Sequence, residues 1–315
     1  MVLGNSGVDL SSQVRLISRL LLKGPVSKSL RCEVLEDFKY SGNSDREFQI
    51  RLLAQESQSW VSGTGRNARI DVAWIKALME LSEALIAKRS GFQSRVGLAG
   101  GLTVATATQR AKAECIERDA FLYHYQSRAA AQYMGDLAPE VGVHLEVYRL
   151  ASAFQEFEIC LVWDRRFSLE GSRGLSFGTA AGLTFSQAKN EAIREWSSTK
   201  ANLRHFDPDS KKVGTVETRN LSSLKQKRIH LDACFDPRNI DRFNRCFRRE
   251  YIDLPKRSEF RNINGDWLIR SFESPIYFGK FIHASPSALQ SLFFGRPEGL
   301  YEDEDPSAPL FHPFW

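Results

Sequence analysis

The sequence contains no hydrophobic run approaching about eighteen residues, the length of a membrane-spanning helix, so it offers no transmembrane segment. Its first residues, MVLGNSGVDLSSQVRL, lack the basic region and apolar block of a secretion signal. The five cysteines are odd in number, scattered and never spaced as CxxC, which argues against a zinc cluster and against a disulfide framework. We therefore expect a cytoplasmic protein with reduced thiols.

Two common nucleotide-binding motifs are also absent. The sequence has no GxxxxGK[ST] loop and no GxGxxG fingerprint, which disfavours an ordinary P-loop ATPase and a Rossmann dehydrogenase. What is present is a globular composition of 315 residues, 42% hydrophobic and 26% charged, enough for one large domain or two intimate halves. The net charge of +5 arises largely from residues 211–261. This basic segment could bind an acidic peptide, a nucleotide or nucleic acid, although a solvated surface is the simplest interpretation.

The most informative pattern is a stretch that occurs twice. The residues GLAGGLTVATATQRAKAE, from Gly97 to Glu114, align with GTAAGLTFSQAKNEAIRE, from Gly178 to Glu195, 81 positions later. Each copy begins with small residues, which let the backbone approach another backbone segment or a ligand closely. A segment rich in Ala, Gln, Lys and Glu, without Gly or Pro, follows and predicts a helix, with Thr103 or Thr184 as its N-cap.

The first of these predicted helices carries an acidic face. Arg110, Glu114 and Glu117 are spaced i, i+4, i+7 and share one face, with Arg118 beside them. Two acids one turn apart suit a hard divalent cation, and such a cation usually accompanies phosphate. A solvated face with charge pairs is the plainer alternative. Against it, Glu195 takes the position of Glu114 in the second copy, and a merely solvated face has no reason to recur behind the same glycine run.

The remaining pattern predicts an α+β protein without a clean domain boundary. We assign residues 1–41 to an N-terminal helix and strand of the same fold, and residues 42–315 to the main domain with a proline-spaced tail at 306–315. Residues 42–60 are interpreted as a glycine turn and a helix carrying Glu56, a degenerate third copy. The other predictions are a core helix at 71–89, a helix at 144–156, a buried strand at 157–163 and two strands within 266–285.

The repeated stretches resemble two signatures of the YcaO family. GLAGGLT followed by AKAECIERDAF is similar to the second signature, and GTAAGLT followed by AIREW is similar to the third. The resemblance implies an α+β fold of pseudo-repeated strand, glycine loop and helix units around an ATP site, with helix glutamates holding Mg²⁺. It also implies ATP-dependent activation of a peptide backbone amide, as in the cyclodehydration of Cys, Ser or Thr to azolines in ribosomally made, microcin-type peptides. The precursor peptide and a leader-binding partner, E1-like or winged-helix, are the implied partners, in a homo- or hetero-oligomer.

The resemblance also implies roles for individual residues. The implied metal ligands are Glu56, Glu114 and Glu117. Arg118 and Glu195 are the nucleotide-site residues that the resemblance implies. In the enzymatic interpretation, Arg110 of the same helix face is a further candidate, and Lys280 or a basic residue of 211–261 neutralises charge on the transferred group. The implied catalytic residues lie in the tail PLFHPFW and are His312 and Trp315. Cys115, inside the second signature, is interpreted as a packed thiol.

One signature departs from the family pattern. The first signature, SxxxExxER, is represented only by LLAQESQSW, in which Glu56 stands where the first acid belongs. The enzyme therefore works with an altered metal set, or the chain is a non-catalytic scaffolding or precursor-binding subunit. Nucleic-acid binding through the basic segment is disfavoured, because the i, i+4, i+8 spacing of Phe243, Phe247 and Tyr251 is more typical of a buried helix face.

Overall fold

The computed structural model describes thirteen stretches of the chain, in which helices and strands are mixed as an α+β fold. The described residues are 31–39, 46–56, 59–89, 97–101, 103–127, 129–138, 143–152, 156–170, 174–205, 234–235, 237–254, 267–271 and 277–281. They fall into two compact units, one of described residues up to Lys112 with 267–271 and 277–281, the other of described residues from Ala113 to Leu254.

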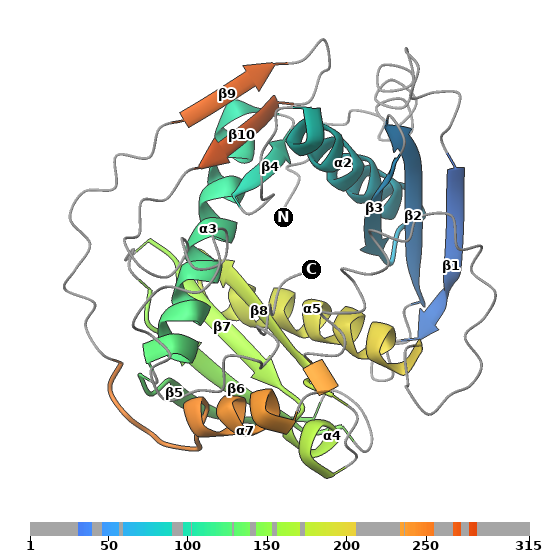
Figure 1. Ribbon diagram of the computed structural model, residues 1–315. Helices are drawn as coiled ribbons and strands as arrows, with labels where there is room; N and C mark the ends of the chain where they lie inside the picture. Colours follow the sequence, from blue (N-terminus) through green and yellow to red (C-terminus); the bar gives the residue numbers. More distant parts are fainter. Residues whose placement is uncertain are drawn as a thin grey trace. The chain divides into compact units, whose positions relative to one another are not determined.

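The first unit contains a three-stranded antiparallel sheet and the helix that covers it (Figure 1). Its elements are β1 (Arg31–Lys39), β2 (Arg46–Glu56), β3 (Ser59–Asn67) and α2 (Ile70–Arg89). Ile50 and Leu52 of β2 are buried with Ala73, Ala77 and Leu81 of α2 in one apolar core. This burial explains why residues 71–89 show a helical apolar period, as the sequence predicts.

A second sheet of the first unit joins segments that are far apart in the chain. Its strands, in the order β4-β10-β9, are β4 (Leu98–Gly101), β10 (Tyr277–Phe281) and β9 (Trp267–Ser271). All pairings are antiparallel, and the register sets Lys280 opposite Leu98 and Tyr277 opposite Gly101. The first glycine run is therefore a strand, and the two strands predicted within 266–285 are confirmed.

The second unit is a four-stranded antiparallel sheet with helices on both faces (Figure 1). Its strands, in the order β5-β6-β7-β8, are β5 (Gln132–Leu137), β6 (Leu145–Leu150), β7 (Glu158–Trp163) and β8 (Phe177–Gly182). Its helices are α3 (Val104–Ser127, from Ala113 onward), α4 (Arg165–Glu170), α5 (Phe185–His205) and α7 (Pro237–Cys246).

Alternation along β8 determines which helix covers which face. The ring of Phe177 lies 5.5 Å from that of Phe121 in α3 and 4.8 Å from that of Phe243 in α7. Its neighbour Gly178 faces the opposite way, toward the backbone of α5. Helices α3 and α7 therefore pack on one face of the sheet and α5 on the other, and buried aromatic rings fill the first of these interfaces.

Two predicted helices are wrong. Where a helix is predicted within residues 42–60, the structure has strand β2 and the start of strand β3. Glu56 is therefore the last residue of a strand and does not lie on a helix. The predicted helix at 144–156 begins instead with β6, a strand buried along most of its length. The buried strand predicted at 157–163 is confirmed as β7.

The described residues include no helix that is long and apolar enough to cross a membrane. Four of the five cysteines are buried, Cys32 is exposed, and none of the five is joined in a disulfide. Burial raises the pKa of the Cys160 thiol, and of the Cys234 thiol, to about 12, which makes both unreactive at neutral pH. Cys115 is 3% exposed, which confirms its interpretation as a packed thiol.

Candidate functional site

The repeated sequence corresponds to a repeated local structure. The hydroxyl oxygen of Thr103 accepts a hydrogen bond from the amide of Thr106 at the start of α3, at 3.1 Å. The hydroxyl oxygen of Thr184 accepts one from the amide of Gln187 at the start of α5, at 3.2 Å. Both threonines are therefore N-caps, as predicted, and satisfy amides that the first helical turn leaves without partners.

The glycines of the two runs bring each strand onto the helix that follows it. A Cβ placed on Gly101 would lie 2.5 Å from the amide nitrogen of Ala107, and one on Gly182 would lie 2.7 Å from that of Ala188. Real Cβ atoms do not approach backbone so closely, so only glycine fits. Of the two uses suggested for the small-residue run, the structure confirms close approach of backbone to backbone.

The first unit contains a third copy of this arrangement, at a place the sequence analysis did not assign. A Cβ on Gly63 of β3 would meet the carbonyl of Ala77 and the amide of Leu81 in α2. In the second unit, a Cβ on Gly178 of β8 would meet the carbonyl of Ala192 and the amide of Trp196 in α5. Strand β3 and helix α2 are therefore the true third copy, in place of residues 42–60.

This correspondence brings forward two acids that sequence reasoning missed. Because Leu81 matches Trp196, Glu80 of α2 matches Glu195 of α5, and one turn further along α2 carries Glu83. Both acids accept backbone hydrogen bonds, Glu80 from the amide of Thr64 at 2.9 Å and Glu83 from that of Gly100 at 2.7 Å. We therefore take Glu80 and Glu83, instead of Glu56, as the acids of this third copy.

A sequence signal for these acids exists. A shift of 34 positions superposes five identical residues, namely Gly63, Ala73, Ala77, Glu80 and Glu83 on Gly97, Ala107, Ala111, Glu114 and Glu117. The apolar stripe of residues 71–89 favours a purely structural interpretation of the same helix, and so hides the acidic pair.

In the second unit, Glu117 of α3 is a largely buried predicted site acid. Its side chain is only 12% exposed. The hydroxyl of Thr179 in β8 donates a hydrogen bond of 2.7 Å to its carboxylate. A guanidinium nitrogen of Arg118, itself 13% exposed, lies 3.6 Å from the same carboxylate oxygen. Thr179 and Arg118 thus fix one oxygen of Glu117.

The electrostatics of Glu117 show that the predicted acids converge. Its pKa is raised to about 7, chiefly by burial, and further by the charges of Glu195 and Glu114, while Arg118 and the Thr179 hydroxyl act to lower it. Glu195 acts from α5, on the other face of the sheet, and β8 is the strand at that sheet's end. The charges of Glu114 and of the exposed Glu195 therefore reach Glu117, and we name these three residues the acid cluster.

The charges of Glu114 and Glu195 disfavour ionisation of Glu117, and a bound cation would relieve that repulsion. In the described part of the chain, no three His, Cys, Asp or Glu side chains form a ready-made metal site. A metal held by protein ligands alone therefore does not fit. Mg²⁺ does fit, because it is usually bound by one or two carboxylates, with water and substrate phosphates completing its coordination.

For the other predicted site residues, the described part of the structure does not show side chains that meet the acid cluster. Arg110, on α3 in the first unit, donates a hydrogen bond of 2.5 Å to the carbonyl of Gly100, and so ties that helix to β4. Lys280 and Glu56 are located by their strands β10 and β2, but their side chains lie outside the described part. His312 and Trp315 lie outside the described residues altogether, so their roles stay predictions.

The aromatic residues of the basic segment divide between core and surface. Phe243 and Phe247 are fully buried, which confirms the prediction of a buried helix face. Tyr251 is 79% exposed, so the prediction is wrong for the third member of the set. With two of the three rings inside the core, the set cannot serve as a base-stacking platform.

Solved structures share this fold. The YcaO from Methanopyrus kandleri, bound with AMPPCP and Mg²⁺, matches with a TM-score of 0.58 and 13% identity over 92% of this chain and 95% of that chain. Two structures of the E. coli microcin synthetase McbBCD complex, one with pro-MccB17 bound, match with TM-scores of 0.51 and 0.52. Both are 9% identical and cover 80% of this chain and 87% of theirs.

At these identities the likeness concerns the fold, and the α+β YcaO-like fold implied by the resemblance is confirmed. No protein-family model and no curated protein matches the sequence.

Proposed function

We propose that this chain is an ATP- and Mg²⁺-dependent enzyme of the YcaO family that activates a backbone amide of a ribosomally made peptide. The observation that carries the proposal is the acid cluster, in which burial, together with the charges of Glu195 and Glu114, raises the pKa of Glu117 to about 7. It is supported by the shared fold with a YcaO bound to AMPPCP and Mg²⁺.

In this proposal the residues of the acid cluster bind the metal that accompanies the nucleotide. Glu117 and Glu114 are the ligands, because they lie one turn apart on α3. Thr179 and Arg118 hold the Glu117 carboxylate in one orientation, at 2.7 and 3.6 Å. When bound, Mg²⁺ supplies positive charge that neutralises phosphate oxygens. Glu117 must lose its proton to bind the metal, and near neutral pH it is poised to do so.

The further roles assigned from the sequence remain part of the proposal. Lys280, Arg110 and Arg118 are candidates for offsetting nucleotide charge, and His312 and Trp315 are candidates in the tail. Positioning and charge stabilisation account for most of the catalysis of phosphoryl transfer, so each of these residues would act by placing charge.

The substrate and partner follow from the neighbouring structures. The microcin synthetase structures contain a complex, and one of them holds pro-MccB17. We therefore propose that this chain acts on a precursor peptide, that cyclodehydration of Cys, Ser or Thr to azolines is its reaction, and that it works beside a leader-binding protein in the cytoplasm.

A second function is favoured by the distribution of acids among the three copies. Helix α3 continues from Glu117 to Arg118, whereas Glu83 of α2 is followed by Ala84, and α5 carries Ser198 at the position of Glu117. Because the arginine that follows the acid pair is absent from α2 and α5 carries one acid instead of two, this pattern is also consistent with a non-catalytic scaffolding or precursor-binding subunit of a synthetase complex.

Peptide-dependent ATP hydrolysis separates the two functions. The purified chain is mixed with a Cys- and Ser-containing precursor peptide, its partner protein, ATP and Mg²⁺, and phosphate release is followed with the peptide mass. If the chain is the enzyme, we expect phosphate release together with loss of water from the peptide. Both should be abolished in Glu117→Gln and retained in Glu191→Gln. Glu191 is a matched control because its carboxylate is 37% exposed and pairs with Arg194 on the surface of α5. Unchanged peptide and no phosphate release favour the scaffold.

A further inference from the structure

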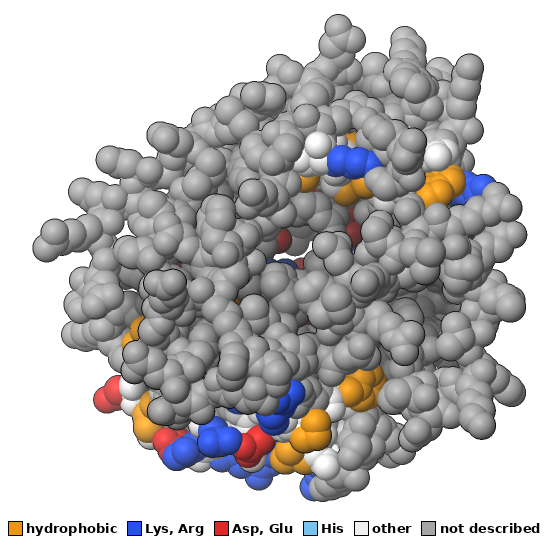
Figure 2. Space-filling model, viewed as in Figure 1, with side chains coloured by type: hydrophobic (Ala, Val, Ile, Leu, Met, Phe, Trp, Pro, Cys, Tyr) orange, Lys and Arg blue, Asp and Glu red, His pale blue; other side chains and the backbone are white. Residues whose placement is uncertain are grey.

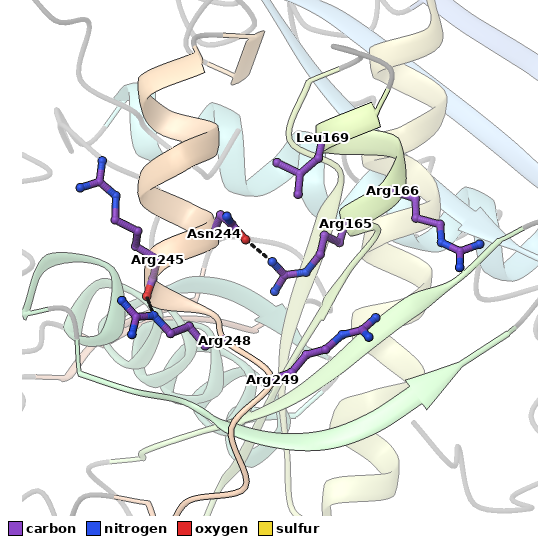
Figure 3. Close-up of a pocket in the computed structure, with 7 residues that line it drawn as sticks. All are labelled: Arg165, Arg166, Leu169, Asn244, Arg245, Arg248 and Arg249. Atoms are coloured by element: carbon purple, nitrogen blue, oxygen red, sulfur yellow. Dashed lines mark hydrogen bonds between the residues drawn. The ribbon is translucent and has the colours of Figure 1, made fainter.

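A basic pocket in the second unit lies apart from the residues of the acid cluster. It has a volume of about 670 Å³ and is formed by α4, the end of α7 and the residues that follow α7 (Figure 3). Its lining residues are Arg165, Arg166, Leu169, Asn244, Arg245, Arg248 and Arg249. Among the described residues, no carboxylate is one of its lining residues, and three of its arginines belong to the basic segment at 211–261.

The side chain of Arg165 lines one wall of this pocket and is held in place by hydrogen bonds. Its guanidinium donates to both carboxylate oxygens of Glu146, at 2.7 and 2.8 Å, and to the carbonyl of Phe247 at 2.6 Å. It also donates to the side-chain oxygen of Asn244, which points toward it across the pocket (Figure 3). Glu146 is fully buried, so this network of charge and hydrogen bonds holds one wall rigid.

The other arginines leave their charge at the surface. The side chains of Arg245 and Arg248 are both 59% exposed and that of Arg249 is 51% exposed. Their acid partners are Asp241, Glu250, Asp136 and the buried Glu146. The contacts to Glu250 and Asp136 are long, at 3.8 Å each. Arg166 is exposed and forms no ion pair with any other described residue.

The exposed pairs with Asp241, Glu250 and Asp136 contribute little and exchange readily for another carboxylate, whereas Arg249 also donates a hydrogen bond of 2.7 Å to the buried Glu146. In the space-filling view, Lys and Arg side chains lie beside both acidic and hydrophobic ones on the face where α4 and α7 lie (Figure 2). The apolar member of the pocket is Leu169, whose side chain projects from α4 toward the cavity and which is 43% exposed (Figure 3).

These features favour a peptide carboxylate as the ligand. Guanidinium groups present a planar fork of donors that matches a carboxylate in a bidentate manner. An exposed Leu169 among the arginines offers a contact for an apolar side chain, which inorganic phosphate lacks. Single-stranded nucleic acid would call for several stacking rings, whereas Phe243 and Phe247 of this region are fully buried and Tyr251 alone of the three rings is exposed. We propose that this pocket binds an acidic peptide segment that carries an apolar residue between its carboxylates, in a precursor or partner protein.

The test is a direct binding measurement without nucleotide or Mg²⁺, so that its failure is independent of any failure of the proposed enzyme function. The probe is a fluorescein-labelled peptide of roughly twelve residues, about 40 Å when extended, whose Glu and Asp residues flank a single Leu. We expect Arg166→Gln/Arg248→Gln to weaken binding about tenfold in fluorescence anisotropy. The control Arg31→Gln/Arg69→Gln removes the same charge from exposed arginines of the first unit and should leave the affinity within about twofold.

Three comparisons complete the test. A peptide with Gln and Asn in place of the acids should not bind, and a single-stranded oligonucleotide and inorganic phosphate should bind without dependence on Arg166 and Arg248. The proposal is overturned if the control variant loses as much affinity as the pocket variant, since bulk charge then explains binding. It is equally overturned if the amide peptide binds as well as the acidic one, or if the oligonucleotide or phosphate is the probe that depends on the pocket. Circular dichroism of both variants, together with the single variant Arg166→Gln at an exposed side chain, excludes loss of folding as the cause.

Discussion

Replacing Glu117 by glutamine tests whether the acid cluster is electrostatically strained in the folded protein. The pKa of Glu117 is raised from 4.5 to about 7. Between these values the folded protein holds a proton that the unfolded chain has lost, so stability falls as the pH rises. This stabilisation is complete below pH 4.5 and is lost as the pH passes through about 7. The loss amounts to at most about 3 kcal/mol, because each pKa unit corresponds to about 1.4 kcal/mol.

Glu117→Gln keeps the shape of the side chain and an oxygen that can accept the Thr179 hydroxyl, but it cannot ionise. At pH 5, where Glu117 is largely protonated, we expect the free energy of unfolding to be nearly unchanged. At pH 8 the variant should be more stable than the parent by about 1–3 kcal/mol, because the penalty of the buried charge is gone. Urea unfolding at both pH values measures this difference.

Glu191→Gln is the control for the stability measurement, since its carboxylate is partly exposed and pairs with Arg194. It removes the same charge and should show no gain at pH 8. If Glu117→Gln is instead less stable than the parent at pH 8, ionised Glu117 is a favourable partner of Arg118. The reasoning from a strained acid cluster then fails.

Three further predictions concern the same region. Gly178→Ala should lower the free energy of unfolding by about 3 kcal/mol or more in urea, because its Cβ would lie 2.2 Å from the carbonyl oxygen of Ala192 and 2.3 Å from the amide of Trp196; a loss under about 0.5 kcal/mol would contradict this packing. Thr179→Val removes the donor to Glu117 and should cost about 1–2 kcal/mol at pH 8 and less at pH 5; equal costs would show that the ionised carboxylate does not use this bond. Calorimetry in two buffers should show Mg²⁺ affinity rising from pH 6 to pH 8 with release of a proton, since Glu117 must ionise to bind metal, and affinity independent of pH would exclude Glu117 as a ligand.

The sequence predicts those parts of the fold whose signals are local. Thr103 and Thr184 are N-caps because their hydroxyl oxygens accept hydrogen bonds from amides of the first helical turn. The glycine runs recur because each run lies against a helix backbone. The hairpin at 46–67 was open to prediction as well. Ile50, Leu52 and Ala54 alternate with less buried residues, which is the period of a strand.

Other parts depend on tertiary contacts that a single sequence does not display. Strand β6 is buried on both faces, and its sequence LEVYRL mixes charged and apolar residues without a period of two, so the sequence alone does not distinguish it from a helix. The convergence of Glu114 and Glu117 with Glu195 depends on two helices lying on opposite faces of one sheet beside β8. The sequence repeat identifies these acids as candidates, but only the packing of the helices on the sheet brings their charges close enough to interact.

The central claim is that the acid cluster holds the metal of a nucleotide. Calorimetric titration of AMPPCP and Mg²⁺ into the purified chain tests it most directly, with Glu117→Gln and Glu191→Gln measured alongside. We predict binding that requires Mg²⁺, that weakens at least about tenfold in Glu117→Gln and that persists in Glu191→Gln. Equal affinity in all three proteins, or binding that does not require Mg²⁺, would contradict the claim.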